Sequence, residues 1–251
     1  NWAITLAFTP YPFLAEGPLS RTAVLGGLLL GLLFFLGQMA CFLALRRGDA
    51  SVVTTVMGSK SLFVALFLVL LGFQPELPGK VWISALLAGV AVALLGWPGQ
   101  NRSIPVRSLA LATFTAACFG LTDALVPQFA RSADPFHLLF IMVATVGLLS
   151  LPVIPMCRGQ FLQWRGPADK CLCWGSVLVA GQALLMSIAI GFHNVPTEAN
   201  VLYASRGLWS VLFAAVIGGW IGLSEASTPR RVVLRRALGA LLLIMGIWLI
   251  A

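Results

Sequence analysis

The feature that most constrains this chain is a succession of long apolar runs. A helix needs about 20 apolar residues to cross the hydrocarbon core of a bilayer, and runs of about that length recur along the 251 residues. Stretches such as Leu62–Leu71 are apolar on every side, which favours helices over the alternating strands of a transmembrane barrel. We therefore predict an all-α membrane helix bundle.

Eight crossings are predicted, after a shorter apolar piece near Trp2–Phe13. They are Ser20–Leu45, Ser51–Phe73, Lys80–Trp97, Arg107–Ala130, Pro135–Met156, Cys171–Phe192, Thr197–Gly222 and Val233–Ala251. Gly and Pro punctuate the connections, as at Asp134-Pro135. Because the connections are short, successive helices should be antiparallel, with no inserted soluble domain.

Composition agrees with this reading. Hydrophobic residues make up 59% of the chain and charged residues 10%, whereas soluble proteins carry about 25% charged residues. This composition argues against a soluble enzyme, a nucleic-acid binder, a disordered adaptor and a disulfide scaffold. The five cysteines include no CxxC pair and no Cys/His metal spacing, so we expect small buried hydrophobes and neither a metal nor a cofactor.

The net charge of +8 is explained by where the cations fall. Eleven lie on one predicted side: Arg46, Arg47, Arg102, Arg107, Arg158, Arg165, Lys170, Arg230, Arg231, Arg235 and Arg236. Three lie on the other: Arg21, Lys80 and Arg131. The positive-inside rule then places the Arg-rich loops in the cytoplasm and the C-terminus outside, in a plasma (inner) membrane. The expected partner of these cations is membrane lipid, not nucleic acid.

The two remaining cations lie inside predicted crossings and reveal an internal repeat. Residues 59–67 (SKSLFVALF) align with residues 205–213 (SRGLWSVLF) at an offset of 146, with four of nine positions identical. Lys60 thereby matches Arg206, and Gly72 matches Gly218. Each cation lies about 9 residues into its predicted helix, or about 14 Å, which is near the midplane.

The two matching helices are the second and the seventh of the eight predicted crossings, an odd difference of five, so the second copy should run through the membrane in the opposite direction. That arrangement is an inverted-topology repeat, which many secondary transporters share. We expect a first repeat of about 3.5 helices over residues 1–100 and a complete five-helix repeat over residues 107–251. The incomplete first copy, and a start at Asn1 rather than Met, predict a processed, trimmed or partial sequence.

The pattern resembles the EamA-like branch of the ten-helix drug/metabolite transporter superfamily. The resemblance rests on Ala44–Gly96 with its Asp49-Ala50-Ser51 helix start, on residues 196–200 and 205–209, and on Leu241–Ile250. It implies a substrate cavity between two inverted bundles, alternating access and no ATPase. Members of this family usually have both termini in the cytoplasm, and the charge count departs from that.

Lys60 and Arg206 are the leading candidates for substrate contact. A cation at the bilayer centre costs about 2.5–3.5 kcal/mol, so it must face the bundle interior, water or a partner. Two such cations would favour an anionic or amino-acid-like solute. The alternative is a structural ion pair, for which Asp123 is the obvious partner. A second role compatible with a buried Asp123 is proton coupling. Glu198, in a helix's first turn, fits a cap or a cavity mouth.

A polar stripe continues from Arg206 along its own helix. Asn200, Tyr203 and Arg206 follow one another at i, i+3 and share a face. Trp209 extends the series, either closing the pocket or packing in the core. Gln38 and Gln182 are further uncharged polar residues that we expect to line the same cavity.

Small residues spaced by four predict close helix packing. The series are Gly27 with Gly31, Ala85 with Gly89 and Ala93, and Ala214 with Gly218 and Gly222. Packing within one bundle and a homodimer face are both compatible with them.

The sequence thus predicts a secondary active transporter for a small metabolite. An enzyme is not expected, because the chain has two His, eight acids and neither an HExxH nor a paired-acid motif. The alternative is a non-transporting lipid scramblase or a membrane partner subunit.

Overall fold

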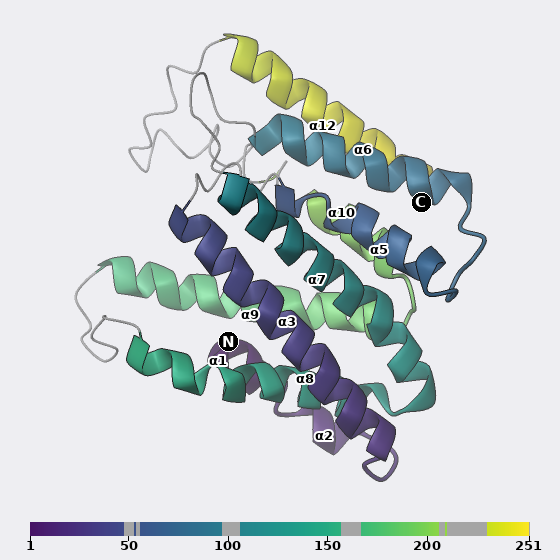
Figure 1. Cartoon of the computed structure of the whole chain (residues 1–251), viewed down its shortest axis with the longest axis vertical. Coiled ribbons are helices and arrows are strands. Elements are labelled where there is room, and N and C mark those ends of the chain that lie inside the picture. The colour runs from purple at the N-terminus through teal and green to yellow at the C-terminus, as the bar shows by residue number, and fades with distance from the viewer. Residues whose placement is uncertain are drawn as a thin grey trace. The chain divides into compact units, whose positions relative to one another are not determined.

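The computed structural model describes residues 1–47, 53, 56–96, 106–156, 167–205, 209 and 230–250. Every regular element in these ranges is a helix, which confirms the all-α class (Figure 1). The elements are α1 (Trp2–Ala7), α2 (Tyr11–Leu14), α3 (Arg21–Arg47), α5 (Lys60–Leu70), α6 (Gly79–Gly96), α7 (Val106–Ser132), α8 (Pro135–Leu149), the 3-10 helix η1 (Leu151–Met156), α9 (Pro167–Gly191), α10 (Pro196–Ala204) and α12 (Arg230–Ile250).

Four helical stretches in the described part of the chain are long and apolar enough to cross a membrane. They are Arg21–Arg46, Val106–Ser132, Pro135–Pro155 and Cys173–Gly191. Between 11% and 44% of the most apolar window of each is buried inside the protein, so more than half of the residues in each window keep part of their surface exposed. An outward-facing apolar surface on long helices indicates an integral membrane protein.

Two predicted crossings are interrupted in the structure, and Lys80–Trp97 corresponds to a shorter apolar helix, Gly79–Leu95. The predicted helix Ser51–Phe73 is interrupted by a turn at Gly58 and Ser59, so that α5 begins at Lys60. Lys60 is therefore the first residue of its helix and not the tenth. The predicted helix Thr197–Gly222 begins as α10 and leaves the helical conformation at Ser205; the remainder lies largely outside the described residues.

Proline and glycine explain other helix ends. Pro10 separates α1 from α2 within the predicted first piece, and the helix that follows Pro135 changes to the 3-10 form at Leu151, where Pro152 and Pro155 lack an N–H to donate. Gly72 follows α5 with a φ of 70°, a left-handed conformation that favours glycine and stops the helix.

By compactness the chain divides into two units. Unit 1 comprises Asn1–Phe35 and Leu125–Val195, and unit 2 comprises Leu36–Ala124 and Pro196–Ala251. The boundaries fall within α3 and α7, so each unit takes segments from both predicted repeats. The repeats at residues 1–100 and 107–251 remain a prediction about sequence and topology.

Unit 1 is held by glycines of α3 that allow close approach of α8. A Cβ added at Gly27 would lie 2.7 Å from Ile141, and one at Gly31 would lie 2.6 Å from the carbonyl oxygen of Met142. The predicted Gly27/Gly31 pair is thus a packing face within the chain. Helix α8 is capped by Asp134, whose side chain accepts hydrogen bonds from the backbone N–H groups of Phe136 and His137.

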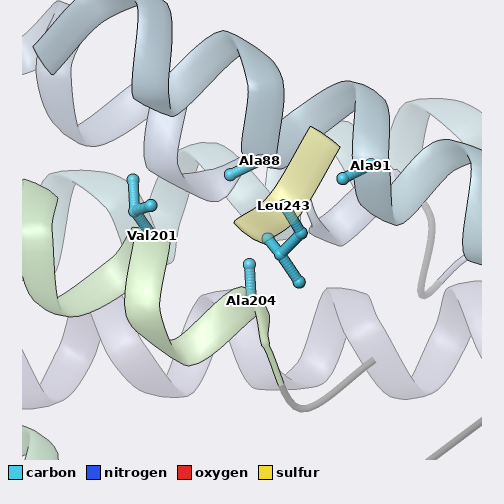
Figure 2. Close-up of a cluster of buried hydrophobic side chains, with 5 residues drawn as sticks. All are labelled: Ala88, Ala91, Val201, Ala204 and Leu243. Carbon is cyan, nitrogen blue, oxygen red and sulfur yellow. The ribbon is translucent and has the colours of Figure 1, made fainter. Parts of the chain in front are cut away.

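Unit 2 contains α6 and α12 side by side, with α10 against both (Figure 1). Figure 2 shows the apolar cluster that joins these three helices: Ala88 and Ala91 of α6, Val201 and Ala204 of α10, and Leu243 of α12. The predicted series Ala85, Gly89 and Ala93 lies on α6, where the carbonyl of Ala85 accepts from the Ser61 hydroxyl of α5. The series Ala214, Gly218 and Gly222 lies outside the described residues.

Helix α7 packs against α5 in unit 2. A Cβ at Gly120 would lie 2.7 Å from the Cβ of Phe63, and Ala124 is buried with Val64 and Leu68. These contacts bring the first turn of α5 to the level of residues 119–124 of α7, where the charged side chains described next are found.

Candidate functional site

Three helices of unit 2 bring together three polar side chains, of which Asp123 and Asn200 are buried and Lys60 is partly buried. The Nζ of Lys60, on α5, lies 2.6 Å from the Oδ2 of Asp123, on α7. The Nδ2 of Asn200, on α10, donates a hydrogen bond of 2.7 Å to the same Oδ2. One carboxylate oxygen is therefore shared by a cation and an amide.

This cluster is largely removed from solvent. The side chains of Lys60 and Asp123 are 18% and 12% exposed, and Asn200 is 4% exposed. Breaking such a pair by removing one partner leaves an uncompensated buried charge, which typically costs about 3–5 kcal/mol. In a membrane helix, a paired charge of this kind marks a functional position by default.

Two aromatic rings border the Lys60 ammonium. Its Nζ lies 5.7 Å from the ring centroid of Phe119 and 6.0 Å from that of Tyr203. Both distances are within the range at which a cation is attracted to the face of a ring. The ammonium is thus held by a carboxylate and by two π faces.

Buried oxygen atoms beside the cluster keep hydrogen-bonding capacity. Within the described residues, the Oδ1 of Asn200 and the Oγ1 of Thr197 have no hydrogen-bond partner, although these residues are 4% and 1% exposed. The Nδ2 of Asn200 is occupied, because it also donates to the carbonyl of Pro196 at 2.7 Å. Buried polar atoms without partners are unusual in proteins and often indicate a place for a ligand or water.

A turn that interrupts the helix immediately precedes Lys60. The Ser59 hydroxyl donates to the carbonyl oxygen of Val56 at 2.7 Å, and the backbone N–H of Ser59 donates to the same carbonyl at 3.0 Å. This i to i−3 bond forms a tight turn in place of the α-helical i to i−4 bond. Discontinuous membrane helices of this kind are typical of transporter binding sites.

The same turn recurs at the matching position of the second copy. The backbone N–H of Ser59 donates to the carbonyl of Val56 at 3.0 Å, and the N–H of Ser205 donates to the carbonyl of Leu202 at 3.0 Å. In the same way, Phe63 N–H donates to the Ser59 carbonyl at 3.3 Å, and Trp209 N–H donates to the Ser205 carbonyl at 3.1 Å. Each pair is related by the 146-residue offset that the sequence predicts. The two segments therefore share a local backbone pattern as well as sequence.

The structure brings together four of the residues that the sequence singled out: Lys60, Asp123, Asn200 and Tyr203. Arg206, the match of Lys60, lies outside the described residues. Trp209 is 52% exposed.

The other predicted residues lie elsewhere. Glu198 lies in the first turn of α10, where an acid complements the helix dipole. Gln38 belongs to α3 in unit 2, with its Oε1 buried and without a hydrogen-bond partner among the described residues. Gln182 belongs to α9 in unit 1.

Sequence reasoning missed two neighbours of the cluster, Phe119 and Thr197. Phe119 precedes Asp123 by four residues and Thr197 precedes Asn200 by three, so both share a helical face with a residue that was singled out. In the described ranges, no group of three or more His, Cys, Asp or Glu is placed to hold a metal ion.

Comparisons with known proteins give a likeness of fold. No family model matches the chain, and no curated protein matches it. A solved structure titled only "Crystal structure of protein" matches 100% of this chain and 94% of its own, with a TM-score of 0.60 and 16% identity. At that identity the match shows that the fold is shared, and it carries no information about function.

Proposed function

We propose that this protein is a secondary active transporter of the drug/metabolite transporter type, which moves a small metabolite across the plasma (inner) membrane by alternating access. The proposal rests on the shared contact of Lys60, Asp123 and Asn200 within a bundle of apolar helices. A buried ion pair is weak evidence for stability, since apolar residues of similar volume often serve as well. Its presence is better explained by a solute that exchanges partners with it.

The helix breaks support a transport role. Lys60 follows the turn at Ser59, and Ser205 forms the matching turn immediately before Arg206. In many transporters, broken helices from two inverted copies supply the binding site, and rocking of one copy against the other opens it to either side. We propose that these two turns are the points at which the helices bend.

The charges suggest the class of solute. Lys60 and Arg206 are cations at matching positions of the two copies, and Asp123 adds a carboxylate. This set suits a small metabolite with an anionic or zwitterionic, amino-acid-like head. Arg206 can hold a carboxylate bidentately, whereas Lys60 acts as a point charge.

Thermal stability in the presence of candidate solutes tests this proposal. The full-length protein in detergent is heated with a panel of anionic and zwitterionic metabolites, with wild type beside Arg206→Gln. A solute that binds only the native state raises the Tm by mass action. We expect such a solute to stabilise wild type and to lose its effect in a folded Arg206→Gln protein. If no solute shifts the wild-type Tm and Arg206→Gln is itself unstable, Arg206 is structural and the proposed site is wrong.

A further inference from the structure

We propose that the surroundings of Lys60 form a binding site for an organic ammonium ion. In this view the Lys60 Nζ is a tethered occupant, and an amine-bearing solute displaces it from Asp123. The use of this site during transport rests on the proposed function, whereas binding of an ammonium ion to the site does not.

The groups around the Nζ are those that recognise ammonium ions. Asp123 supplies a carboxylate oxygen at 2.6 Å, and Phe119 and Tyr203 supply ring faces at 5.7 and 6.0 Å. Aromatic cages combined with negative charge bind alkylammonium groups in proteins. Here the three groups come from α7 and α10, while the cation comes from α5, so the cage does not depend on the helix that fills it.

The spare hydrogen-bonding capacity also favours an ammonium ion over an anion. In the described part of the chain, the Oδ1 of Asn200, a pure acceptor, lacks a partner, as does the Oγ1 of Thr197 one turn earlier. A primary ammonium group brings three donors, whereas a carboxylate or phosphate monoester dianion brings acceptors alone. An ammonium ion offers donors to acceptors of this kind, whereas an anion would leave the amide oxygen unpaired.

The position of Lys60 allows its ammonium group to leave Asp123. It is the first residue of α5 and follows the turn at Ser59, at the helix end where the macrodipole disfavours a cation. Its ammonium is carried on a flexible four-carbon stem. Replacement of Lys60 by a solute ammonium would keep the charge beside Asp123 constant, so the exchange leaves no uncompensated carboxylate.

Chemical rescue of Lys60→Ala tests the site. This substitution removes Cγ, Cδ, Cε and Nζ, which together equal n-propylammonium. We expect n-propylammonium to raise the Tm of the full-length Lys60→Ala protein saturably, by about 5 °C at 100 times its Kd. The wild type, in which Lys60 competes for the site, should show a much smaller shift at the same concentration. Lys80→Ala, which alters an exposed lysine of the same unit, and uncharged 1-propanol are the matched controls.

Several outcomes would overturn the proposal. The first is that n-propylammonium does not shift the Tm of folded Lys60→Ala. The second is that 1-propanol shifts the Tm of Lys60→Ala as much as n-propylammonium does. The third is that n-propylammonium shifts the Tm of Lys60→Ala/Asp123→Asn as much as that of Lys60→Ala. If Lys60→Ala folds only when n-propylammonium is present during purification, the site is supported; if it stays unfolded even then, the proposal is wrong. Failure of reconstituted wild type to transport any solute, with rescue intact, contradicts the proposed function alone.

Discussion

At the scale of single residues, the Oδ2 atom of Asp123 is the centre of the account. It receives the Lys60 ammonium at 2.6 Å and the Asn200 amide at 2.7 Å. Because both partners come from other helices, this one atom links α5, α7 and α10. Its removal should therefore affect both stability and function.

We expect Asp123→Asn to lower the free energy of unfolding by about 3–5 kcal/mol, because the buried Lys60 ammonium loses its counter-charge. Denaturation in detergent measures the change. Glu76→Gln, at an exposed acid of the same unit, is the control and should change the stability little. The double variant Lys60→Met/Asp123→Leu, which removes both charges, should recover most of the stability. A double variant as unstable as Asp123→Asn would contradict the ion-pair explanation.

Sequence patterns could single out the polar members of this cluster because charged and amide groups are rare in apolar helices. Lys60 was recognised from its match with Arg206, and Asn200 and Tyr203 from their i, i+3 spacing. Phe119 was not recognised, since one phenylalanine in an apolar helix resembles any packing residue. Its role depends on the distance to an ammonium from another helix, which periodicity does not contain.

At the scale of elements, the architecture depends on where helices break and how closely they pack. The apolar run Ser51–Phe73 predicts one continuous helix, whereas α5 begins at Lys60. Hydropathy cannot detect this break, because the Ser59 side chain makes it by bonding to the Val56 carbonyl. The Gly27/Gly31 packing face, in contrast, follows directly from residue size.

Gly31→Ala should be destabilising, because its Cβ would lie 2.6 Å from the backbone carbonyl of Met142, which cannot move aside alone. Overpacking of this kind costs about 1–3 kcal/mol. Gly181→Ala on α9 is the matched control, since its Cβ would meet nothing within 4 Å and alanine favours a helix. Thermal unfolding of the two variants should move in opposite directions; equal Tm values would contradict the packing of α3 on α8.

Asp134→Ala should remove the N-cap of α8, which accepts from Phe136 N at 2.8 Å and from His137 N at 3.3 Å. Loss of such a cap costs about 1 kcal/mol. Asp134→Asn keeps an acceptor oxygen and should retain most of the stability. If the two variants are equally destabilised, the carboxylate charge rather than the cap is responsible.

At the scale of the whole molecule, composition predicted an all-helical membrane protein, and the structure agrees with four membrane-length helices in its described part. The orientation of the chain across the bilayer is a separate prediction, which rests on the positive-inside rule. The charge count makes a definite statement about it, with eleven cations on one side and three on the other.

Cysteine accessibility tests the topology. In a background without the native cysteines, Arg46→Cys and Lys80→Cys each place one thiol at an exposed position. A membrane-impermeant maleimide added to intact cells should label Lys80→Cys and leave Arg46→Cys unlabelled until the membrane is opened. Labelling of Arg46→Cys in intact cells would contradict the predicted orientation.

Solute flux in proteoliposomes is the decisive test of the proposed transport function. Purified wild type, Asp123→Asn and Glu76→Gln are reconstituted at equal density, and uptake of anionic, zwitterionic and amine-bearing metabolites is measured under a proton gradient and in exchange. We predict that at least one solute accumulates with wild type and Glu76→Gln, and that folded Asp123→Asn reduces its rate at least tenfold. If no solute moves, or if Asp123→Asn transports as fast as wild type, the cluster is not a transport site and the account is wrong.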